Sequence, residues 1–583
     1  MNASLMEAPS QNEATTIDST LRCELITNFS RLEDLSSEWQ RLFGADQNAE
    51  IFQSFAWARA WWRCYGDQVV LRTLAVFEGE RMIGIVPLVQ ERDRIVFLGG
   101  THADYCDILS EQGRAAEVFE AALETLLQLP DWNECVLRNL KVGGQIFKPL
   151  AALPKRLHRH LQTVPCEDCH TILLGANRDV LVALLGKEHT KRRIKKLRKA
   201  GTLTFRHIET KAEAQAQLSD FFQHYTRRRA LAGKEGSTLE FVQFLRNLIN
   251  ELDLSQELRF GVLALNDRPL AWHFSFHVNG KLLFYQQTFD VDMWDYSPGE
   301  VLMHQLLLYA QANVSREFDF TRGNEPFKDR FTTHLQESYS LYIERSGIVG
   351  LLRRVLRACE IPWLRLGRHT QSLAKRHDRT FHAFRSIRLW TSGVLARIHY
   401  HRKKGTLARW AVNSVARFLR SLRLRGAEVD LYSPDAVTGD ATGLAVASNS
   451  NLSVRDGGLG DLVDLALLHP EIVVPYELAK YRHRLRKGDR VYLVRQGKEV
   501  VLAGWVTTCK RNEILPPSQQ DSGDGPLMLL YECWPVSNVL NSLHYRHLLF
   551  EVSKEAEKKQ AILGVSCADQ VPALRSEVKR QRV

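Results

Sequence analysis

The feature that most limits how this chain can fold is a strand–turn–strand pattern that occurs three times. The copies are "LRTLAVFEGERMIGIVPLVQ" (71–90), "LRFGVLALNDRPLAWHFSFHV" (258–278) and "VYLVRQGKEVVLAGWVTT" (491–508). The second strand of each copy contains a small residue (Gly84, Ala271 or Gly504), where a bulge or a closely bound ligand would fit. A chain of 583 residues is too long for one hydrophobic core, so two to four domains are expected.

The second copy continues into the most informative part of the sequence. A turn at Asn279-Gly280 leads to the apolar strand 281–289, and a helix begins at "SPGE" (297–300). In "EFDFTRGNEPFKDRF" (317–331), phenylalanines alternate with polar residues until a charged turn breaks the pattern. Two hairpins, a strand, a helix and a further strand predict an α/β (α+β) fold of mixed sheets flanked by helices.

This order of elements resembles the GNAT acyltransferase fold. In detail, the chain resembles the CelD/BcsL-type acetyltransferases associated with cellulose and exopolysaccharide biosynthesis, which are related to the FemAB-like tandem-GNAT proteins. The likeness runs from about residue 22 to residue 345 and implies tandem GNAT-like domains. It rests on "IFQSFAWARAWWRCYG" (51–66), "GIVPLV" (84–89), "ADYCDIL" (103–109), "RRIKKLRKAGTLTFR" (192–206), "YSPGEVL" (296–302) and, most specifically, "FDFTRGNEPFKDRF" (318–331).

The predicted organisation has seven parts. They are a disordered N-terminus (1–21), a first GNAT-like domain (22–165), a second GNAT-like domain that binds the donor and carries catalysis (166–345), a basic amphipathic helical segment (346–426), a linker (427–465), a degenerate GNAT-like domain (466–570) and a basic tail (571–583). The degenerate domain has no glycine in the stretch 534–550, where a donor loop would lie, so we expect it to recognise substrate or to dock.

The turn "YSPGEVL" (296–302) is the first part of the predicted donor site. Ser297 can cap the helix that follows, Pro298 suits the first helical position, and Glu300 can close a capping box. Free amides at a helix N-terminus bind phosphate. The resemblance implies that Ser297, Gly299 and Glu300 hold the pyrophosphate of acetyl-CoA or another acyl-CoA. The usual glycine-rich loop is reduced to Gly299, and an ordinary helix start stays open as the alternative.

Basic residues form the second part of the predicted donor site. "KEHTKRRIKKLRKAG" (187–201) holds eight Lys and Arg in fifteen residues, and Arg193 and Lys196 are the expected contacts to an anionic donor. Arg322 is a further phosphate contact, because a guanidinium binds phosphate at two points. A solvated basic helix is the alternative.

Three residues are predicted to carry the chemistry. Asp104 would deprotonate the acceptor, because a carboxylate near an apolar strand edge has a raised pKa. Lys328 would bind phosphate or polarise the acyl carbonyl, and Asp319, between two phenylalanines, would serve both fold and reaction. An ordinary loop is the alternative for the segment around Asp104, and a solvated turn is the alternative for the segment with Asp319 and Lys328. No metal is expected, since the Cys-x-x-Cys-His at 166–170 has no second pair of cysteines.

The net charge of +11 comes from one segment. Residues 345–425 hold 20 Lys and Arg against Glu360 and Asp378, a local charge of +18, so the other residues sum to −7. Helical pieces with basic polar faces predict that 347–425 binds an anionic membrane surface. RNA, or packing on the acidic remainder of the chain, is the alternative, and DNA is not expected.

The predicted compartment is the cytoplasm, with peripheral attachment to the inner face of the membrane. The sequence begins without the basic and apolar regions of a signal peptide, and no apolar run approaches the ~20 residues of a membrane span. Ten scattered cysteines fit reduced thiols better than a disulfide framework.

The predicted function is transfer of an acetyl or other acyl group from acyl-CoA to an amine or hydroxyl of a polysaccharide-related or small acceptor. A FemAB-like ligase that uses aminoacyl-tRNA is a second reading, which the basic clusters allow. A non-catalytic, membrane-associated scaffold of exopolysaccharide synthesis is a third, favoured by the missing glycines at 296–302 and 534–550.

Overall fold

A computed structural model describes most of the chain, in several stretches. They are residues 21–147, 149–174, 179–232, 236–323, 327–345, 352–358, 430–432, 452–469, 477–510, 526–536 and 542–565, with the single residues 234, 325, 350 and 473. The predicted disordered N-terminus (1–21, except residue 21) and basic tail (571–583) lie outside them. Contacts divide the chain into two compact units. The first comprises 1–220, 238–287 and 299–373, and the second comprises 221–237, 288–298 and 374–583.

The first repeat begins with a strand and three helices before its hairpin. Its elements are β1 (Arg22–Ile26), α1 (Phe29–Asp34), α2 (Ser36–Ala45), η1 (Ile51–Gln53), α3 (Phe55–Tyr65), η2 (Gly66–Gln68), β2 (Val70–Leu71), β3 (Thr73–Glu78), β4 (Arg81–Val86), β5 (Leu88–Glu91), β6 (Arg94–Phe97), β7 (Leu109–Ser110), α4 (Ala115–Gln128), β8 (Glu134–Lys141), η3 (Pro149–Ala152), α5 (Lys155–His158) and β9 (Leu161–Leu173). The predicted second strand of the hairpin is interrupted at Pro87, which has no N–H for a ladder. As a result β4 and β5 belong to different sheets.

The second repeat follows the same order. Its elements are α6 (Asp179–Leu185), α7 (Glu188–Ala200), β10 (Leu203–His207), α8 (Lys211–Leu231), α9 (Leu239–Glu251), β11 (Leu258–Leu265), β12 (Arg268–Val278), β13 (Lys281–Phe289), η4 (Val291–Tyr296), α10 (Pro298–Asn313), β14 (Glu317–Arg322), η5 (Lys328–Arg330) and β15 (His334–Glu344). The predicted hairpin, the strand 281–289, the helix and the next strand are confirmed. The α/β class with mixed sheets is confirmed as well.

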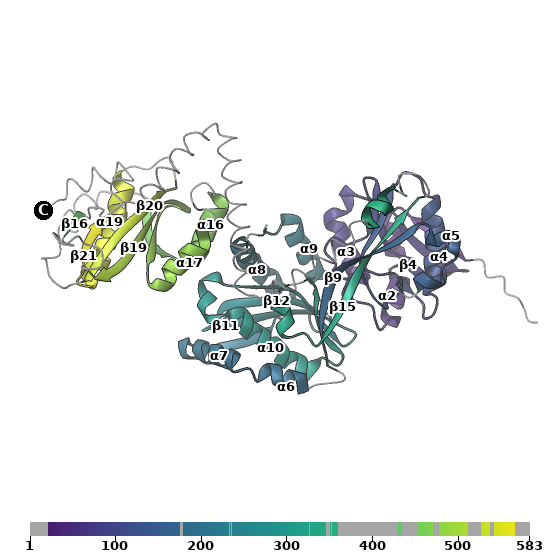
Figure 1. Ribbon diagram of the computed structural model, residues 1–583, viewed down its shortest axis with the longest axis horizontal. Coiled ribbons are helices and arrows are strands. Elements are labelled where there is room, and N and C mark those ends of the chain that lie inside the picture. The colour runs from purple at the N-terminus through teal and green to yellow at the C-terminus, as the bar shows by residue number, and fades with distance from the viewer. Residues whose placement is uncertain are drawn as a thin grey trace, which may run out of the picture. The chain divides into compact units, whose positions relative to one another are not determined.

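The two repeats share one sheet. Eleven strands run in the order β10-β11-β12-β13-β14-β9-β15-β8-β6-β5-β2, and β1-β3-β4-β7 form a separate four-stranded sheet. The paired strands β9 and β15 lie side by side in Figure 1. β9 pairs with β14 on one side and with β15 on the other, so strands from both repeats alternate at the centre. The predicted domain boundary between residues 165 and 166 falls inside β9, and the first unit contains residues of both repeats.

An aromatic helix pair also joins the repeats. The Ser54 hydroxyl accepts from the Trp57 N–H and caps α3, and Thr238 caps α9 in the same way. The rings of Trp57 and Phe244 meet edge to face at 4.9 Å. Trp57 is fully buried, so this contact removes a large apolar area from water at the junction.

The small residues of the hairpins serve helix packing. A Cβ on Gly84 would lie 2.4 Å from Cγ1 of Val118 on α4, and one on Gly504 would lie 2.7 Å from Leu548. The ladders are irregular nearby, with register shifts beside Phe77 and beside Val506. Bulges therefore occur where the repetition predicted them, and helices occupy the space at Gly84 and Gly504 that a ligand would need.

The third repeat has the same order again. Its elements are β16 (Asp430–Tyr432), β17 (Leu452–Gly457), α16 (Leu459–Leu468), α17 (Leu478–Lys487), β18 (Arg490–Gln496), β19 (Glu499–Lys510), β20 (Pro526–Pro535), α19 (Ser542–Lys558) and β21 (Ile562–Val565). Six strands form the sheet β16-β21-β20-β19-β18-β17. The predicted linker 427–465 contains β16, β17 and the start of α16, so the predicted domain start at 466 is too late.

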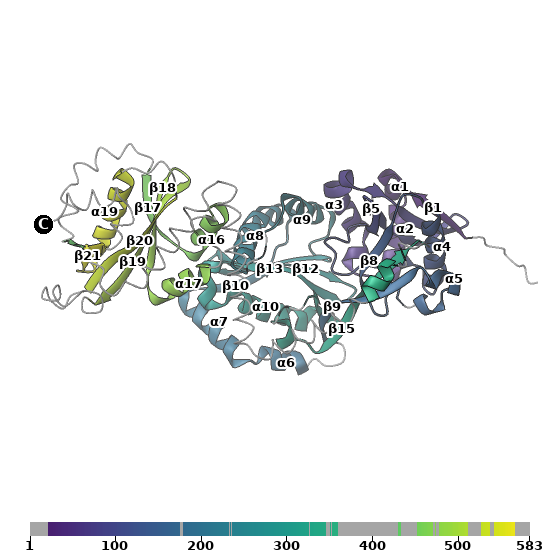
Figure 2. The same ribbon diagram turned by 45° about the horizontal axis from the view of Figure 1, so that its top comes forward.

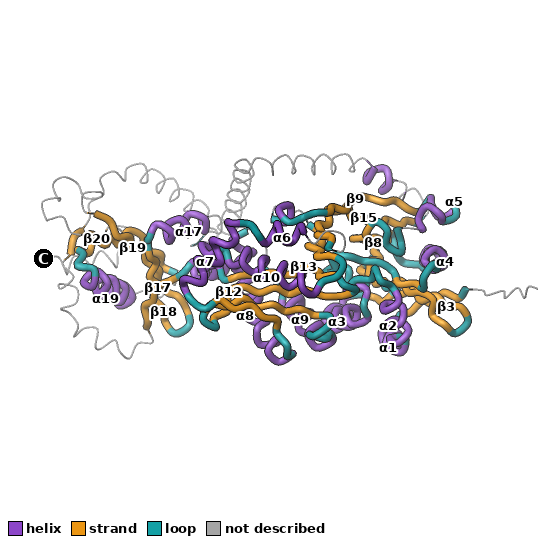
Figure 3. The backbone as a smooth tube through the Cα atoms, turned by 90° about the horizontal axis from the view of Figure 1, so that it is seen from below, coloured by secondary structure: helices purple, strands orange, loops and turns teal. Residues whose placement is uncertain are grey.

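The sheet of the third repeat is covered on both faces (Figure 3). Tyr492 and Val494 pack with α19, whereas Val491 and Leu493, which alternate with them along β18, pack with α16 and α17. Segments 221–237 and 288–298 belong to the same unit. Within it, Arg227 binds Asp464 (2.6 Å), and the Gly460 N–H donates to Asp292 Oδ1 (2.8 Å).

Most of the predicted basic segment (346–426) lies outside the described residues. Residues 352–358 are helical. There Arg357 pairs with Glu344 and Glu134, while Leu352, Val355 and Leu356 are each more than half exposed. Membrane binding stays a prediction. No helix among the described residues is long and apolar enough to cross a membrane.

We predict that Gly84→Ala lowers the free energy of unfolding by about 1–3 kcal/mol, because its methyl group would enter the space of Val118. Gly44→Ala is the matched control. A Cβ there meets no atom of a described residue outside its own helix within 4 Å, so this exchange near the end of α2 should be neutral or stabilising by up to about 1 kcal/mol. Denaturant unfolding measures both, and an equal effect of the two variants would contradict the close approach of α4.

Candidate active site

The site is built where two neighbouring parallel strands separate. β13 and β14 pair only over Lys281–Leu283 and Glu317–Asp319, after which no further pairing joins them. Phe284, Phe320 and Phe327 pack beyond this point, with ring centroids about 6 Å apart. The carboxyl end of β14 therefore carries polar groups beside an aromatic cluster, which is where ligands collect in open α/β sheets.

The backbone at the end of β14 is strained. Thr321 has a φ of +59°, in the left-handed region that a β-branched residue rarely adopts. Its N–H donates to Asp319 Oδ1 (2.7 Å), its hydroxyl donates to the Phe284 carbonyl (3.3 Å), and its carbonyl accepts from Lys328 Nζ (3.4 Å). The conformation persists because three contacts hold it, and such residues cluster at functional sites.

This turn brings two predicted site residues together. Arg322 Nε donates to Asp104 Oδ1 (3.1 Å), and its Nη1 donates to Glu167 Oε2 (3.4 Å). Asp104 comes from the loop between β6 and β7, in the first repeat, and Arg322 ends β14. Gly323, with a φ of +112°, makes the turn that follows, as predicted. The pair therefore joins the two repeats at the carboxyl end of β14.

Asp104 has the properties of a general base. Its side chain is 16% exposed, and burial raises its pKa to about 6 against the opposing effects of Arg322 and Lys328. Such a carboxylate is ionised at pH 7, and its pKa is close enough to that pH for a general base. Asp107, three residues later, accepts three backbone N–H groups (Ile108, Gln145 and Ile146) and braces the loop instead.

Lys328, which was expected to bind phosphate or polarise the acyl carbonyl, is buried inside the turn that follows β14. Lys328 is 4% exposed, and Nζ donates to the Arg322 carbonyl (2.7 Å) and pairs with Glu325 (3.0 Å). These acceptors, with the Thr321 carbonyl, engage its donors within the turn. Lys328 therefore holds the turn that positions Arg322, and its loss should cost stability as well as activity.

Asp319 is the centre of a buried ionic network that links the repeats. It is fully buried, and it accepts from Tyr105 Oη (2.8 Å), Lys141 Nζ (3.1 Å) and the Thr321 N–H. Lys141 also donates to Glu50 Oε1 (2.9 Å). The burial of Asp319 agrees with its expected contribution to the fold, and two of its three partners, Tyr105 and Lys141, are far away in the sequence.

The rest of the network was not predicted. Lys281 Nζ donates to Glu50 Oε1 (3.0 Å) and pairs with Glu317 (3.1 Å). Burial would raise the pKa of Glu50, but the two ammonium groups outweigh it and lower that pKa. Burial likewise opposes the charge of Lys141, yet Glu50 and Asp319 raise its pKa. In the sequence, the one indication of this network is Lys281, a lysine at the start of an apolar strand.

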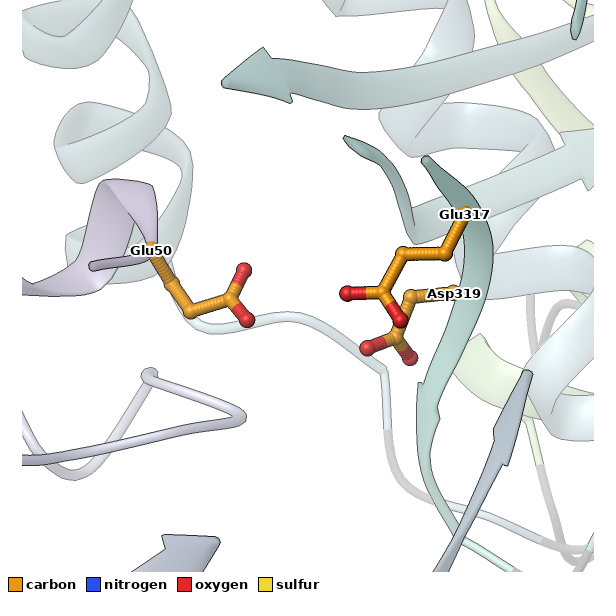
Figure 4. Close-up of side chains that lie close together, drawn as sticks. All are labelled: Glu50, Glu317 and Asp319. Carbon is orange, nitrogen blue, oxygen red and sulfur yellow. The ribbon is translucent and has the colours of Figure 1, made fainter. Parts of the chain in front are cut away.

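The acidic side chains of this network come close enough together to suggest a metal site. Oxygens of Glu50, Glu317 and Asp319 lie within 4.8 Å of one another (Figure 4). However, Lys141 bridges Glu50 to Asp319, and Lys281 bridges Glu50 to Glu317. Each of the three carboxylates is already paired with one or both ammonium groups, so the donor set fits the lysines better than a metal.

The start of α10 differs from the predicted donor turn. Ser297 has φ 53° and ψ 54°, a left-handed conformation, whereas an N-cap residue is extended. Glu300 does not close a capping box with it: its side chain pairs with Arg193 and with Arg330 (2.9 Å). An anion therefore already sits in the first turn of α10, where a phosphate would bind. Gly299 remains the small residue of this turn.

Arg193 and Lys196 both lie on α7, but only Arg193 faces Glu300. α7 and α10 lie side by side (Figure 2) and line a groove of about 610 Å³. Its walls include Lys191, Lys195, Arg198 and Lys199. The predicted basic helix is confirmed, with Ile194 and Leu197 buried on its inner face. Lys196 is exposed and outside the groove lining.

Comparison with known proteins assigns a class to this part of the chain. Residues 186–329 match the family model of an acetyltransferase (GNAT) domain. The chain thus contains a GNAT acyltransferase domain, which covers the strands that separate, α10 and Arg322. The predicted GNAT domain is confirmed for these residues, and the finer CelD/BcsL assignment stays a prediction.

Solved structures of low sequence identity also resemble the chain. The crystal structure of FemX is 11% identical and covers 55% of this chain and 97% of that chain, with a TM-score of 0.40. A tandem GNAT protein from the clavulanic acid biosynthesis pathway is 11% identical and covers 56% and 99%, with a TM-score of 0.35. L-PGS from Bacillus licheniformis is 9% identical and covers 53% and 97%, with a TM-score of 0.36. No curated protein gave a significant match.

We predict that Asp319→Ala lowers the free energy of unfolding by about 3–5 kcal/mol, because it leaves the Lys141 ammonium without one of its two buried partners. Asp329→Ala, nearby on a 44% exposed side chain, should change stability by no more than about 0.5 kcal/mol. Denaturant unfolding compares the two variants. Similar values for both would show that the network contributes little.

Proposed function

We propose that the protein transfers an acyl group from acyl-CoA to an amine or hydroxyl of a carbohydrate-related acceptor, at the carboxyl end of β14. The observation that carries the proposal is the Asp104–Arg322 pair. It places a partly buried carboxylate of raised pKa against a guanidinium at the end of β14, a strand within the GNAT domain. GNAT domains use acyl-CoA as co-substrate, which supports this donor.

Each residue has a defined role in this proposal. Asp104 accepts the proton of the acceptor amine or hydroxyl as that atom attacks the acyl carbonyl. Arg322 binds donor phosphate or the developing oxyanion with its guanidinium. Lys328 and Asp319 hold the strained turn at Thr321, so that Arg322 points toward Asp104. Lys328 thus acts on the reaction through position.

The donor end requires a rearrangement of charge. Glu300 pairs with Arg193 and Arg330 at the start of α10, so a pyrophosphate must compete with this carboxylate for both guanidinium groups. We propose that Gly299, Arg193 and Arg330 contact the donor once Glu300 is displaced. The groove of lysines and arginines between α7 and α10 would support the longer anionic donor of a tRNA-dependent ligase, which is the second candidate.

We predict that kcat/KM rises with pH through an apparent pKa of about 6, because Asp104 must be ionised to accept a proton. The same raised pKa lowers the free energy of unfolding as the pH rises from about 4, the ordinary aspartate pKa, to about 6. Over this pH range the folded state keeps the proton on Asp104, whereas the unfolded state releases it. Asp104→Asn should lose about 100-fold or more in kcat and lose the pH dependence. Glu167→Gln, which changes the other carboxylate partner of Arg322, should keep the pH dependence.

Two results would contradict the assignment of Asp104. One is an unchanged pH profile in Asp104→Asn with measurable activity. The other is an equal loss of activity in Glu167→Gln, which would indicate that Arg322 needs only neighbouring negative charge. Both are read in an acyl-transfer assay with acetyl-CoA and a panel of amino sugars and neutral sugars.

We predict that Glu300→Gln strengthens CoA binding by about 2- to 5-fold, since removal of a like charge at a helix N-terminus contributes roughly 0.3–1 kcal/mol. Glu188→Gln, on a 74% exposed side chain at the start of α7, should leave the affinity unchanged. Isothermal titration with CoA measures both. Weaker binding by Glu300→Gln would show that Glu300 orders the donor site and does not compete with phosphate.

A further inference from the structure

The groove between α7 and α10 is lined by positive charge alone. It has a volume of about 610 Å³, and the two helices that form it lie side by side in the GNAT domain (Figure 2). Lys191, Lys195, Arg198 and Lys199 line it, and all four side chains are exposed. No Asp or Glu among the described residues belongs to the lining, so an anion that enters the groove meets only cations.

The charge of this groove is mostly uncompensated within the protein. Lys191 pairs with Glu188 (3.1 Å), whereas no carboxylate among the described residues pairs with the other three cations. α7 holds seven Lys and Arg against Glu188, a local charge of +6. Lys191, Lys195 and Lys199 follow one another at intervals of four residues, a spacing at which like charges destabilise a helix. A bound anionic partner would relieve this repulsion.

The groove begins beside the proposed donor site and extends away from it. Glu300 lies in the first turn of α10, and His304 and Leu308 of the groove lining lie roughly 6 and 12 Å further along the helix axis at 1.5 Å per residue. The cations from Lys191 to Lys199 also span roughly 12 Å, a little over two helical turns. This length suits an extended anionic surface such as the side of a helix.

The apolar part of the lining distinguishes between the possible polyanions. Leu308 is 40% exposed there, and no Phe, Tyr or Trp of the described chain lines the groove for base stacking. Nucleic-acid phosphates gain nothing from a leucine, and membrane binding requires a broad apolar face. An acidic amphipathic helix fits both features, because its carboxylates pair with the cations while an apolar side chain packs on Leu308.

The donor turn indicates which acidic protein would bind here. Glu300 pairs with Arg193 and Arg330 in the first turn of α10, so the pyrophosphate of CoA has to displace this carboxylate. A phosphopantetheine arm on a carrier protein contains a single phosphodiester, and the remaining negative charge lies on the acidic helices of the protein. An acyl carrier protein therefore supplies the same thioester with less competition at Glu300.

We propose that the groove docks an acidic helix of an acyl carrier protein, whose acyl-phosphopantetheine arm then reaches the Asp104–Arg322 pair. This inference rests on the proposed acyl transfer and adds a second donor to acyl-CoA. The acceptor amine or hydroxyl attacks the thioester carbonyl, and a C–N or C–O bond forms as the C–S bond breaks. The proton that Asp104 takes from the acceptor passes to the thiolate of the arm.

The first test measures docking without turnover. A type II acyl carrier protein in its acetyl form is titrated into the full chain by calorimetry, and bulk tRNA and phosphatidylglycerol vesicles are tested in parallel. We expect the carrier protein to bind with a Kd below about 0.1 mM and to bind more weakly as salt rises. Lys195→Glu and Arg198→Glu should each weaken its binding at least about tenfold, because each replaces an attraction by a repulsion.

Lys155→Glu is the matched control for the change of charge. Lys155 is an exposed lysine on α5, outside the groove lining, so this variant should bind the carrier protein normally. All three substitutions are at exposed positions and leave the buried residues Ile194 and Leu197 of α7 in place. The folded state should therefore persist in each variant.

The second test compares the two donors in the acyl-transfer assay. Arg198→Glu should raise the KM for the acetyl carrier protein about tenfold or more. Its kcat/KM with acetyl-CoA should stay within about twofold, because charges more than ~8 Å apart are largely screened at physiological salt. An equal loss with both donors would contradict a groove that serves the carrier protein alone.

Three binding results would overturn the inference. They are the absence of carrier-protein binding, unchanged binding in both groove variants, and groove-dependent binding of tRNA or vesicles alone, which would reassign the groove to nucleic acid or membrane. If acetyl-CoA is turned over while the carrier protein does not bind, the inference is wrong and the proposed function stands. If the carrier protein binds through the groove and neither donor is turned over, the docking surface stands and the proposed function is wrong.

Discussion

The structure of the first unit depends on one buried carboxylate. Asp319 has no exposed surface, and its oxygens accept from Tyr105, Lys141 and the Thr321 N–H. A buried charge of this kind is tolerated only when every partner is in place. Two of these partners belong to the first repeat and one to the second, so the network forms only when both repeats have packed. The same contacts hold Thr321 in its strained conformation and thereby aim Arg322 at Asp104.

The fold connects this network to two distinct ends of β14. At the carboxyl end, the strands have separated and polar groups from both repeats meet, which suits chemistry on a bound acyl donor. At the amino end, Lys281 and Glu317 open into a polar pocket. Each end therefore contains residues of both repeats. Both ends of β14 lie in the continuous eleven-stranded sheet that the two repeats share.

Much of the second repeat could be predicted from the sequence, because its elements follow from local patterns. The Asn279-Gly280 turn and the apolar stretch after it indicated the strand 281–289, and "SPGE" marked the start of α10. Asp104 and Arg322 were both predicted, and the structure brings them within hydrogen-bond distance. Glu50, Lys141 and Lys281 could not be found in this way, because they are far apart in the sequence. Lys141 lies 91 residues after Glu50, and Lys281 lies 231 residues after it. Burial of Lys328 and the pairing of Glu300 with Arg193 likewise depend on tertiary contacts that charge patterns do not reveal.

The central claim is that Asp104 and Arg322, from different repeats, act as one catalytic unit. A double-mutant cycle of Asp104→Asn and Arg322→Gln on kcat/KM tests it most directly. If the two residues act together, the double variant should lose little more activity than the worse single variant, with an interaction energy of about 0.5–3 kcal/mol. If the losses instead add within about 0.5 kcal/mol, the residues act independently, and the proposed active site is contradicted.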